Sequence, residues 1–193
     1  MTVVSDKMNL VFIHNPRTGG TNIQNILHEL FPDSAEGKTS THLFASFFTN
    51  GKYRDYLKFG FVRNPWDRYY SIFKKVTGFH SKTLGKECEF FNRWVLEGKG
   101  KTKAEFNCQA DWFYDKNNNL LVDYIGRFEN YEDDLRFFLE SYLGVEIGEI
   151  PVDNETKRRY DYRDVYYDES IKHVDRKFGR DIELFEYEFD YGY

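Results

Sequence analysis

Two segments of the chain follow one pattern, in which a short apolar run leads through a sharp turn into an amphipathic helix. They cover 10–31 and 56–76. Apolar runs of this length are typical of buried strands, and the helical spacing of Ile23, Ile26 and Leu27 predicts a helix after the first turn. Strands that alternate with helices favour a parallel sheet covered on both faces. We therefore expect an α/β three-layer sandwich with a central parallel sheet flanked by helices.

The remaining elements follow from the same patterns and fit a single domain over 1–193. Strands are predicted over 10–14, 56–62 and 120–128, and helices over 21–31, 41–49, 65–76, 87–96, 130–143 and 168–178. Asn64 is a suitable cap for the helix that begins at Pro65, because proline is favoured at the first helical position. Ligands of parallel sheets bind beyond the carboxyl ends of the strands, where both turns lie.

Composition excludes several classes of protein. The net charge of −5 does not favour nonspecific binding of nucleic acid. No apolar run approaches the roughly 20 residues that span a bilayer, and the first residues lack a basic region followed by a long apolar one. Cys88 and Cys108 lack the spacing of a metal site or a disulfide framework. We expect a soluble cytoplasmic protein with no nucleic-acid or membrane partner.

The first turn has the features of an anion site. Its glycines let the backbone approach an anion closely, and the first N–H groups of the following helix have no partner within it. Arg17 adds a positive charge. The candidate ligands are Arg17, Thr18, Gly19, Gly20, Thr21 and Asn22. The turn is not a Walker A loop, which places Lys after its last Gly. The alternative is a glycine-containing turn that binds nothing.

The second turn offers another cation and a hydroxyl. Arg63 follows the strand over 56–62, and Ser71 lies on the helix that begins at Pro65. A guanidinium can bind a phosphate through two parallel hydrogen bonds, and a serine hydroxyl can add a third. The alternatives are a surface salt bridge for Arg63 and a buried hydroxyl bonded to its own helix for Ser71. Two anion sites in a small chain indicate a ligand with phosphate-like groups at both ends.

With both motifs identified, the chain resembles the sulfotransferases that use 3′-phosphoadenosine 5′-phosphosulfate (PAPS). The nearest branch contains the heparan sulfate 2-O-sulfotransferases and small bacterial and viral relatives. Those enzymes carry a Pro-Lys-Thr-Gly-Gly-Thr-like loop and an Arg-(Asp/Asn)-Pro-x-x-Arg-x-x-Ser segment, which correspond to 16–21 and 63–71. The segment 125–132 and the region 162–189 are also similar. The match is weakest over 78–119.

The resemblance implies a fold like that of P-loop NTPases and a role for each motif. The loop at 16–21 would bind the 5′-phosphosulfate of PAPS, and Arg63 with Ser71 would bind the 3′-phosphate, with no metal. The chain departs from the family in having Arg17 where Lys is usual. Because the two side chains differ in length and shape, the change bears on rate more than on binding.

The implied reaction moves a sulfuryl group from PAPS to a hydroxyl, for which a carbohydrate is the favoured source. A small metabolite or a peptide tyrosine stays open as the acceptor. His42, which matches a histidine between the two motifs of the heparan-type relatives, is the expected general base, and Arg17 stabilises the leaving phosphate. His14 is the rival, although it is better suited to support the loop. The alternatives are a P-loop kinase and a noncatalytic nucleotide-binding module. A bacterial or viral source is expected.

Overall fold

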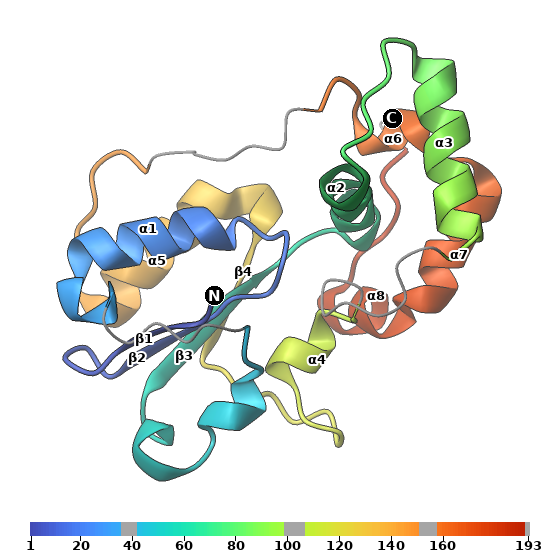
Figure 1. The fold of residues 1–193 in the computed structure, drawn as a ribbon. Coiled ribbons are helices and arrows are strands. Elements are labelled where there is room, and N and C mark those ends of the chain that lie inside the picture. The colour runs from blue at the N-terminus through green and yellow to red at the C-terminus, as the bar shows by residue number, and fades with distance from the viewer. Residues whose placement is uncertain (36–41, 99–106, 151–157, 192–193) are drawn as a thin grey trace. The chain divides into compact units, whose positions relative to one another are not determined.

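The computed structural model describes residues 1–35, 42–98, 107–150 and 158–191 (Figure 1). Two compact units are present. The first unit comprises Met1–Arg63 and Gln109–Asn154, and the second comprises Asn64–Cys108 and Glu155–Tyr193. The single domain over 1–193 stays a prediction.

A four-stranded sheet forms the centre of the first unit. Its strands are β1 (Val3–Ser5), β2 (Leu10–Ile13), β3 (Leu57–Val62) and β4 (Tyr124–Arg127), in the order β1-β2-β3-β4. The strands β2, β3 and β4 are parallel, as predicted, whereas β1 pairs with β2 in the antiparallel direction. The α/β class is confirmed, and the sheet is mixed because the chain turns back after β1 through Asn9, whose φ is +49°.

Helices cover both faces of this sheet. The helices are α1 (Gly20–Leu30), α4 (Ala110–Phe113) and α5 (Tyr131–Leu143), with 3₁₀ turns at Pro32–Ala35, Ala45–Phe48, Gly51–Tyr53 and Phe128–Asn130. The helices α1 and α5 lie side by side on one face (Figure 1), where Ile23, Leu27 and Leu135 share a core with the strand residues. On this face the rings of Phe59 and Phe138 stack at 3.9 Å. On the opposite face, the ring of Phe113 in α4 packs directly against the backbone of Gly60.

Two predicted elements differ from the observed ones. The helix expected over 41–49 is the 3₁₀ turn Ala45–Phe48, and residue 41 lies outside the described residues. The strand expected over 120–128 is confined to Tyr124–Arg127, because Leu120 forms an isolated bridge with Tyr114 instead of joining β3. The apolar residues at 120–122 therefore lie in the segment that follows this bridge and leads into β4.

The second unit is helical in its described part. Its helices are α2 (Pro65–Thr77), α3 (Leu84–Leu96), α6 (Tyr162–Val165), α7 (Asp168–Lys177) and α8 (Gly179–Phe185). Aromatic side chains fill its core: the ring of Phe73 lies 5.2 Å from that of Phe91 and 5.4 Å from that of Trp94. None of the helices in the described ranges is both long and apolar enough to cross a bilayer.

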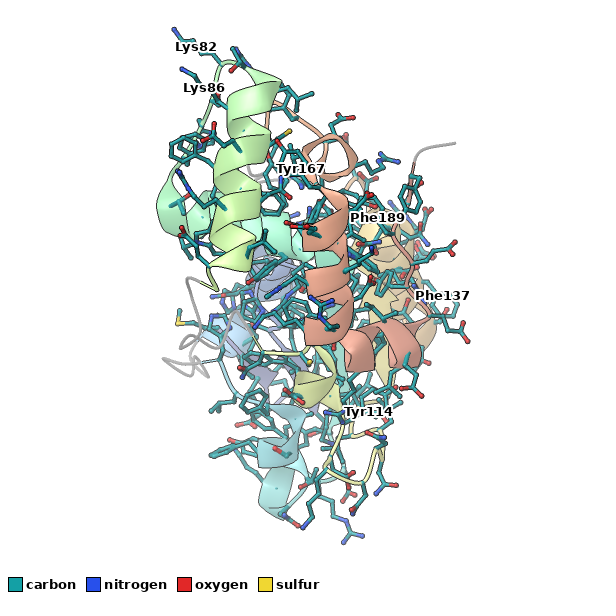
Figure 2. All side chains as sticks on the ribbon, turned by 90° about the vertical axis from the view of Figure 1, so that its right-hand side faces the viewer. Lys82, Lys86, Tyr114, Phe137, Tyr167 and Phe189 are labelled. Carbon is teal, nitrogen blue, oxygen red and sulfur yellow. The ribbon has the colours of Figure 1, made fainter. Side chains whose placement is uncertain are left out.

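A buried ion pair joins α2 to α3. The Nζ of Lys74 lies 2.7 Å from Oε1 of Glu87, and both side chains are almost fully buried. The Tyr70 hydroxyl and the Ser81 N–H also donate to this carboxylate. These donors hold the pKa of Glu87 below its ordinary value, although burial alone raises it. By contrast, Lys82, just before α3, and Lys86, in its first turn, are exposed (Figure 2).

Candidate functional site

The two predicted anion motifs begin at the same edge of the sheet. The strands β2 and β3 are hydrogen-bonded parallel neighbours, and Ile13 near the end of one pairs with Gly60 in the other. Beyond these ends, Nη1 of Arg63 donates to the main-chain oxygen of Arg17 at 3.2 Å. The structure therefore brings the first motif and the Arg of the second together within the first unit.

The turn after β2 is strongly bent. Arg17 and Gly19 both have left-handed backbone conformations, with φ of +71° and +78°. Such angles suit glycine and cost a side-chain-bearing residue about 1 kcal/mol or more. The buried Thr18 hydroxyl donates to the main-chain oxygen of Asn15 at 2.8 Å, which closes the turn on itself. The bend directs the chain into α1 immediately after Gly19.

The start of α1 supplies main-chain donors. The N–H groups of a first helical turn lie at the positive end of the helix dipole, and in α1 that of Asn22 donates back to the main-chain oxygen of Gly19 at 3.0 Å. Thr21 is exposed, so its side chain is accessible at this end. Asn22 is buried, and its Nδ2 donates to the Tyr131 hydroxyl at 3.0 Å. The side chain of Asn22 therefore ties α1 to α5. In this first turn the exposed side chain is that of Thr21.

Arg63 is fixed by an aromatic ring. Its guanidinium carbon lies 4.0 Å from the centre of the Phe128 ring, a cation–π geometry, and the residue is only 4% exposed. Phe128 follows β4 and belongs to the segment 125–132 that resembles the family, although sequence reasoning gave it no role. Arg17 and Arg63 are thus two basic residues at one edge of the sheet, which favours an anion there.

The rest of the second motif lies in the second unit. Asn64 caps α2, since its Oδ1 accepts from the N–H groups of Trp66 and Asp67 at 3.1 and 3.4 Å. Ser71 is fully buried on this helix. Arg68 is buried and donates to the main-chain oxygen of Asn107 at 3.2 Å. The cap predicted from the sequence is confirmed.

Three consecutive basic residues at 157–159 lie in the C-terminal third of the chain. Arg158 forms an ion pair with Asp67 in the first turn of α2, and Arg159 donates to the main-chain oxygen of Lys82. Lys157 lies outside the described residues.

Two histidines stand beside the loop. His42 is exposed, and its Nδ1 lies 2.9 Å from the main-chain oxygen of His14. A carbonyl oxygen only accepts, so Nδ1 carries the hydrogen, and in neutral His42 the basic nitrogen is Nε2. The rings of the two histidines meet edge to face at 4.6 Å. The ring of Trp112 also meets that of His42 edge to face, at 6.1 Å.

The environment of His14 differs from that of His42. Its side chain is 7% exposed, and burial, followed by the nearby amino group of the chain, lowers its pKa to about 3. A β-carbon placed on Gly20 would lie only 2.2 Å from the His14 ring. His14 is therefore neutral at pH 7 and packs directly under the first residue of α1.

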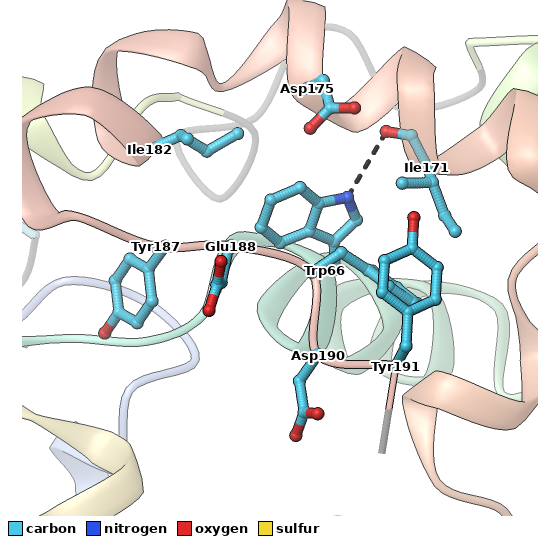
Figure 3. Close-up of a pocket in the computed structure, with 9 residues that line it drawn as sticks. Trp66, Ile171, Asp175, Ile182, Tyr187, Glu188, Asp190 and Tyr191 are labelled. Atoms are coloured by element: carbon cyan, nitrogen blue, oxygen red, sulfur yellow. Dashed lines mark hydrogen bonds between the residues drawn. The ribbon is translucent and has the colours of Figure 1, made fainter. Parts of the chain in front are cut away.

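A cavity in the second unit is separate from these residues. Its volume is about 580 Å³, and Figure 3 shows its lining by Trp66, Ile171, Asp175, Ile182, Tyr187, Glu188, Phe189, Asp190 and Tyr191. Burial raises the pKa of Asp175 above its ordinary value. None of the predicted ligand or catalytic residues lines this cavity, and its three carboxylates would repel an anion.

Sequence reasoning also missed Gln109. It is fully buried in the first unit and bonds to the main chain of Arg63. The residue lies in the region where the family resemblance is weakest, so no motif indicates it. Within the described ranges, no group of three His, Cys, Asp or Glu side chains could hold a metal ion.

The comparison with known families gives one match. A family model described as the sulfotransferase family matches residues 1–188. No curated protein and no solved structure gives a significant match. The matched region contains both turns, His42 and all of the residues predicted for the site.

Proposed function

Because the chain belongs to the sulfotransferase family and its activity is therefore sulfuryl transfer, we propose that it uses PAPS as donor and a hydroxyl group as acceptor. The loop from Arg17 to Thr21 binds the 5′-phosphosulfate, with Asn22 supporting the first turn of α1. Arg63 binds the 3′-phosphate, and Ser71 is assigned to the same phosphate from the motif spacing. His42 is the general base.

One observation carries this proposal. Arg63 donates to the main chain of Arg17, so the first motif and the Arg of the second lie at adjacent strand ends. A donor with a phosphosulfate at one end and a phosphate at the other needs two neighbouring anion sites. Two sites for unrelated anions would not need to be joined by a hydrogen bond between Arg63 and the loop.

The residues present fit such a donor. Gly19 and Gly20 carry no side chains of their own at the start of α1, and Arg17 is only half-buried. The N–H groups at a helix start and a nearby guanidinium are the usual partners of phosphate groups. When bound, PAPS supplies the activated sulfuryl group, and the chain supplies the donors that hold its charged ends.

The transfer itself is a displacement at sulfur. The acceptor oxygen forms a bond to sulfur while the bond from sulfur to the phosphate oxygen breaks, which releases adenosine 3′,5′-bisphosphate. The hydroxyl proton passes to the general base. Negative charge grows on the leaving phosphate, where Arg17 and the main-chain N–H groups of the loop stabilise it.

The tautomer of His42 supports its role as base. Its Nδ1 donates a hydrogen bond to the carbonyl oxygen of His14, so the nitrogen that can accept a proton is Nε2. The rival His14 is buried, and its pKa of about 3 makes it a poor acceptor of the proton. His14 is better suited to hold His42 and the loop in place.

The finer assignments rest on the resemblance alone. A carbohydrate hydroxyl is the proposed acceptor, the heparan sulfate 2-O branch stays a prediction, and so do the cytoplasmic location and the bacterial or viral source. The P-loop kinase is the less favoured alternative, because the chain lacks the Walker A lysine.

Incubation with ³⁵S-labelled PAPS and a panel of hydroxyl acceptors tests the proposal. We expect label transfer, lowered about 10²-fold or more by His42→Ala. His80→Ala is the matched control, because His80 is an exposed histidine of the second unit. Near-normal turnover in His42→Ala would remove this base from the mechanism. Donor binding without transfer would favour a noncatalytic module, and consumption of ATP would favour a kinase.

A further inference from the structure

A single buried amide continues the sheet beyond the ends of its strands. Gln109, which begins the second segment of the first unit, is fully buried. Its Oε1 accepts from the N–H of Arg63 at 2.9 Å, and its Nε2 donates to the main-chain oxygen of Arg63 at 2.7 Å. One side chain thus satisfies both main-chain polar groups of the residue that follows β3, as a neighbouring strand would.

The same amide reaches the first motif. Its Oε1 also accepts from Nδ2 of Asn15 at 3.1 Å, and Asn15 is the second residue after β2. Asn15 is fully buried and its Nδ2 donates to the main-chain oxygen of Phe61 as well. The last paired residues of the β2–β3 ladder are Ile13 and Gly60, so beyond them these side-chain amides make the connection.

The contacts close into a ring around the candidate site. Thr18 donates to the main chain of Asn15, and Asn15 donates to Gln109. Gln109 holds the main chain of Arg63, whose side chain returns to the main chain of Arg17, next to Thr18. Every member is part of the first unit. The loop and Arg63 therefore have their spacing fixed by one hydrogen-bonded circuit.

From this circuit we infer that Gln109 is a positioning residue that sets the distance between the phosphosulfate loop and Arg63. The inference rests on the proposed function, because it assigns the spacing to a donor that is held at both ends. A ligand with two anionic ends gains affinity only if both sites fit it at once. Loss of the amide lets Arg63 shift relative to the loop, so the 3′-phosphate contributes less to the binding affinity.

The test compares two nucleotides in calorimetry. Adenosine 3′,5′-bisphosphate engages both sites, and adenosine 5′-monophosphate engages only the loop. Gln109→Met keeps the length of the side chain and removes its hydrogen bonds. We expect it to weaken bisphosphate binding about tenfold or more while changing monophosphate binding by less than about threefold. In an Arg63→Ala background the same substitution should have no further effect on the ratio of the two affinities.

Asn92→Leu is the matched control. Asn92 is a buried amide of the second unit with three comparable bonds, to the main chains of Cys88, Val165 and Tyr167. It should lower stability without changing the affinity ratio. If Gln109→Met yields no folded protein, Gln109→Glu serves instead. It keeps an acceptor oxygen but places a carboxylate against the Arg63 carbonyl. We expect the same selective weakening of bisphosphate binding relative to monophosphate binding.

The outcomes separate the two claims. Equal weakening of both nucleotides in the Gln109 variants, or no weakening, would overturn the positioning role. A wild-type protein that binds the bisphosphate no better than the monophosphate would instead contradict the proposed function. A selective loss of the bisphosphate preference in both Gln109 variants, absent in Asn92→Leu, supports the inference.

Discussion

The contact between Gly20 and His14 gives the sharpest test of the loop. In Gly20→Ala, the new β-carbon would lie 2.2 Å from Cδ2 and 2.3 Å from Nε2 of His14. Carbon atoms in ordinary contact are about 3.5 Å or more apart, so the ring must move by more than about 1 Å. It has little room, because the ring of His42 lies 4.6 Å away and that of Phe12 lies 5.6 Å away.

The cost follows from overpacking. Forcing an extra carbon into a filled site typically costs about 1–3 kcal/mol, which exceeds the gain of up to about 1 kcal/mol from replacing a helical glycine by alanine. For a chain of 193 residues each kcal/mol corresponds to about 2–4 °C in Tm. We therefore expect Gly20→Ala to unfold earlier in both urea and thermal melts monitored by circular dichroism.

The control is Gly85→Ala in the first turn of α3, where a β-carbon would meet nothing within 4 Å. It should be as stable as the wild type or slightly more stable. A double-mutant cycle then isolates the contact, since Gly20→Ala should cost much less in a His14→Ala background. An equal cost in the two backgrounds, or equal melts for the two alanine variants, would refute the packing argument.

Three further predictions concern charge. Arg17→Ala should lower kcat for sulfuryl transfer about 10²–10³-fold, whereas Arg17→Lys should keep most of the rate; equal rates for wild type and Arg17→Ala would exclude a role in the leaving group. Burial keeps His14 neutral when folded, whereas the unfolded chain binds a proton below about pH 6.5. Stability should therefore fall by up to about 1.4 kcal/mol per unit as pH drops from 6.5 to 5, and denaturant melts of His14→Gln should lose this component. Glu87→Gln should lower the free energy of unfolding by about 3–5 kcal/mol because Lys74 is left buried without its partner. Since the folded pKa of Glu87 is lowered, its stabilising effect should persist in the wild type at neutral pH and disappear on acidification below about pH 4; a melt of Glu87→Gln matching the wild type would contradict this.

Much of the sheet and of the loop could be predicted because local patterns determine them. The apolar runs that form β2 and β3 and the cap at Asn64 are visible within a few residues. The strand β1 was not predicted, since Val3–Ser5 is too short to show a period and its hairpin has no glycine signal. The predicted strand over 120–128 was too long, because the bridge between Leu120 and Tyr114 depends on the tertiary fold.

In the candidate site, too, local motifs indicate some residues and only tertiary contacts indicate others. Arg17, His42 and Arg63 stand out by motif or by placement between motifs. The ring of Phe128 under Arg63 and the amide of Gln109 do not, because their partners are distant in sequence and their residue types are common in ordinary cores. A single sequence shows which residues can bind an anion, and the tertiary contacts show what holds those residues in place.

The first unit is assembled from two stretches of chain separated by the helices α2 and α3. During synthesis the β2–β3 pair can form early, but β4, α5 and Gln109 emerge only later. Pairing that waits for distant sequence is slow and leaves a strand edge open to other chains meanwhile. A nascent chain that stops before residue 109 would therefore carry an uncovered β3 edge, and aggregation is the fate expected of such a fragment.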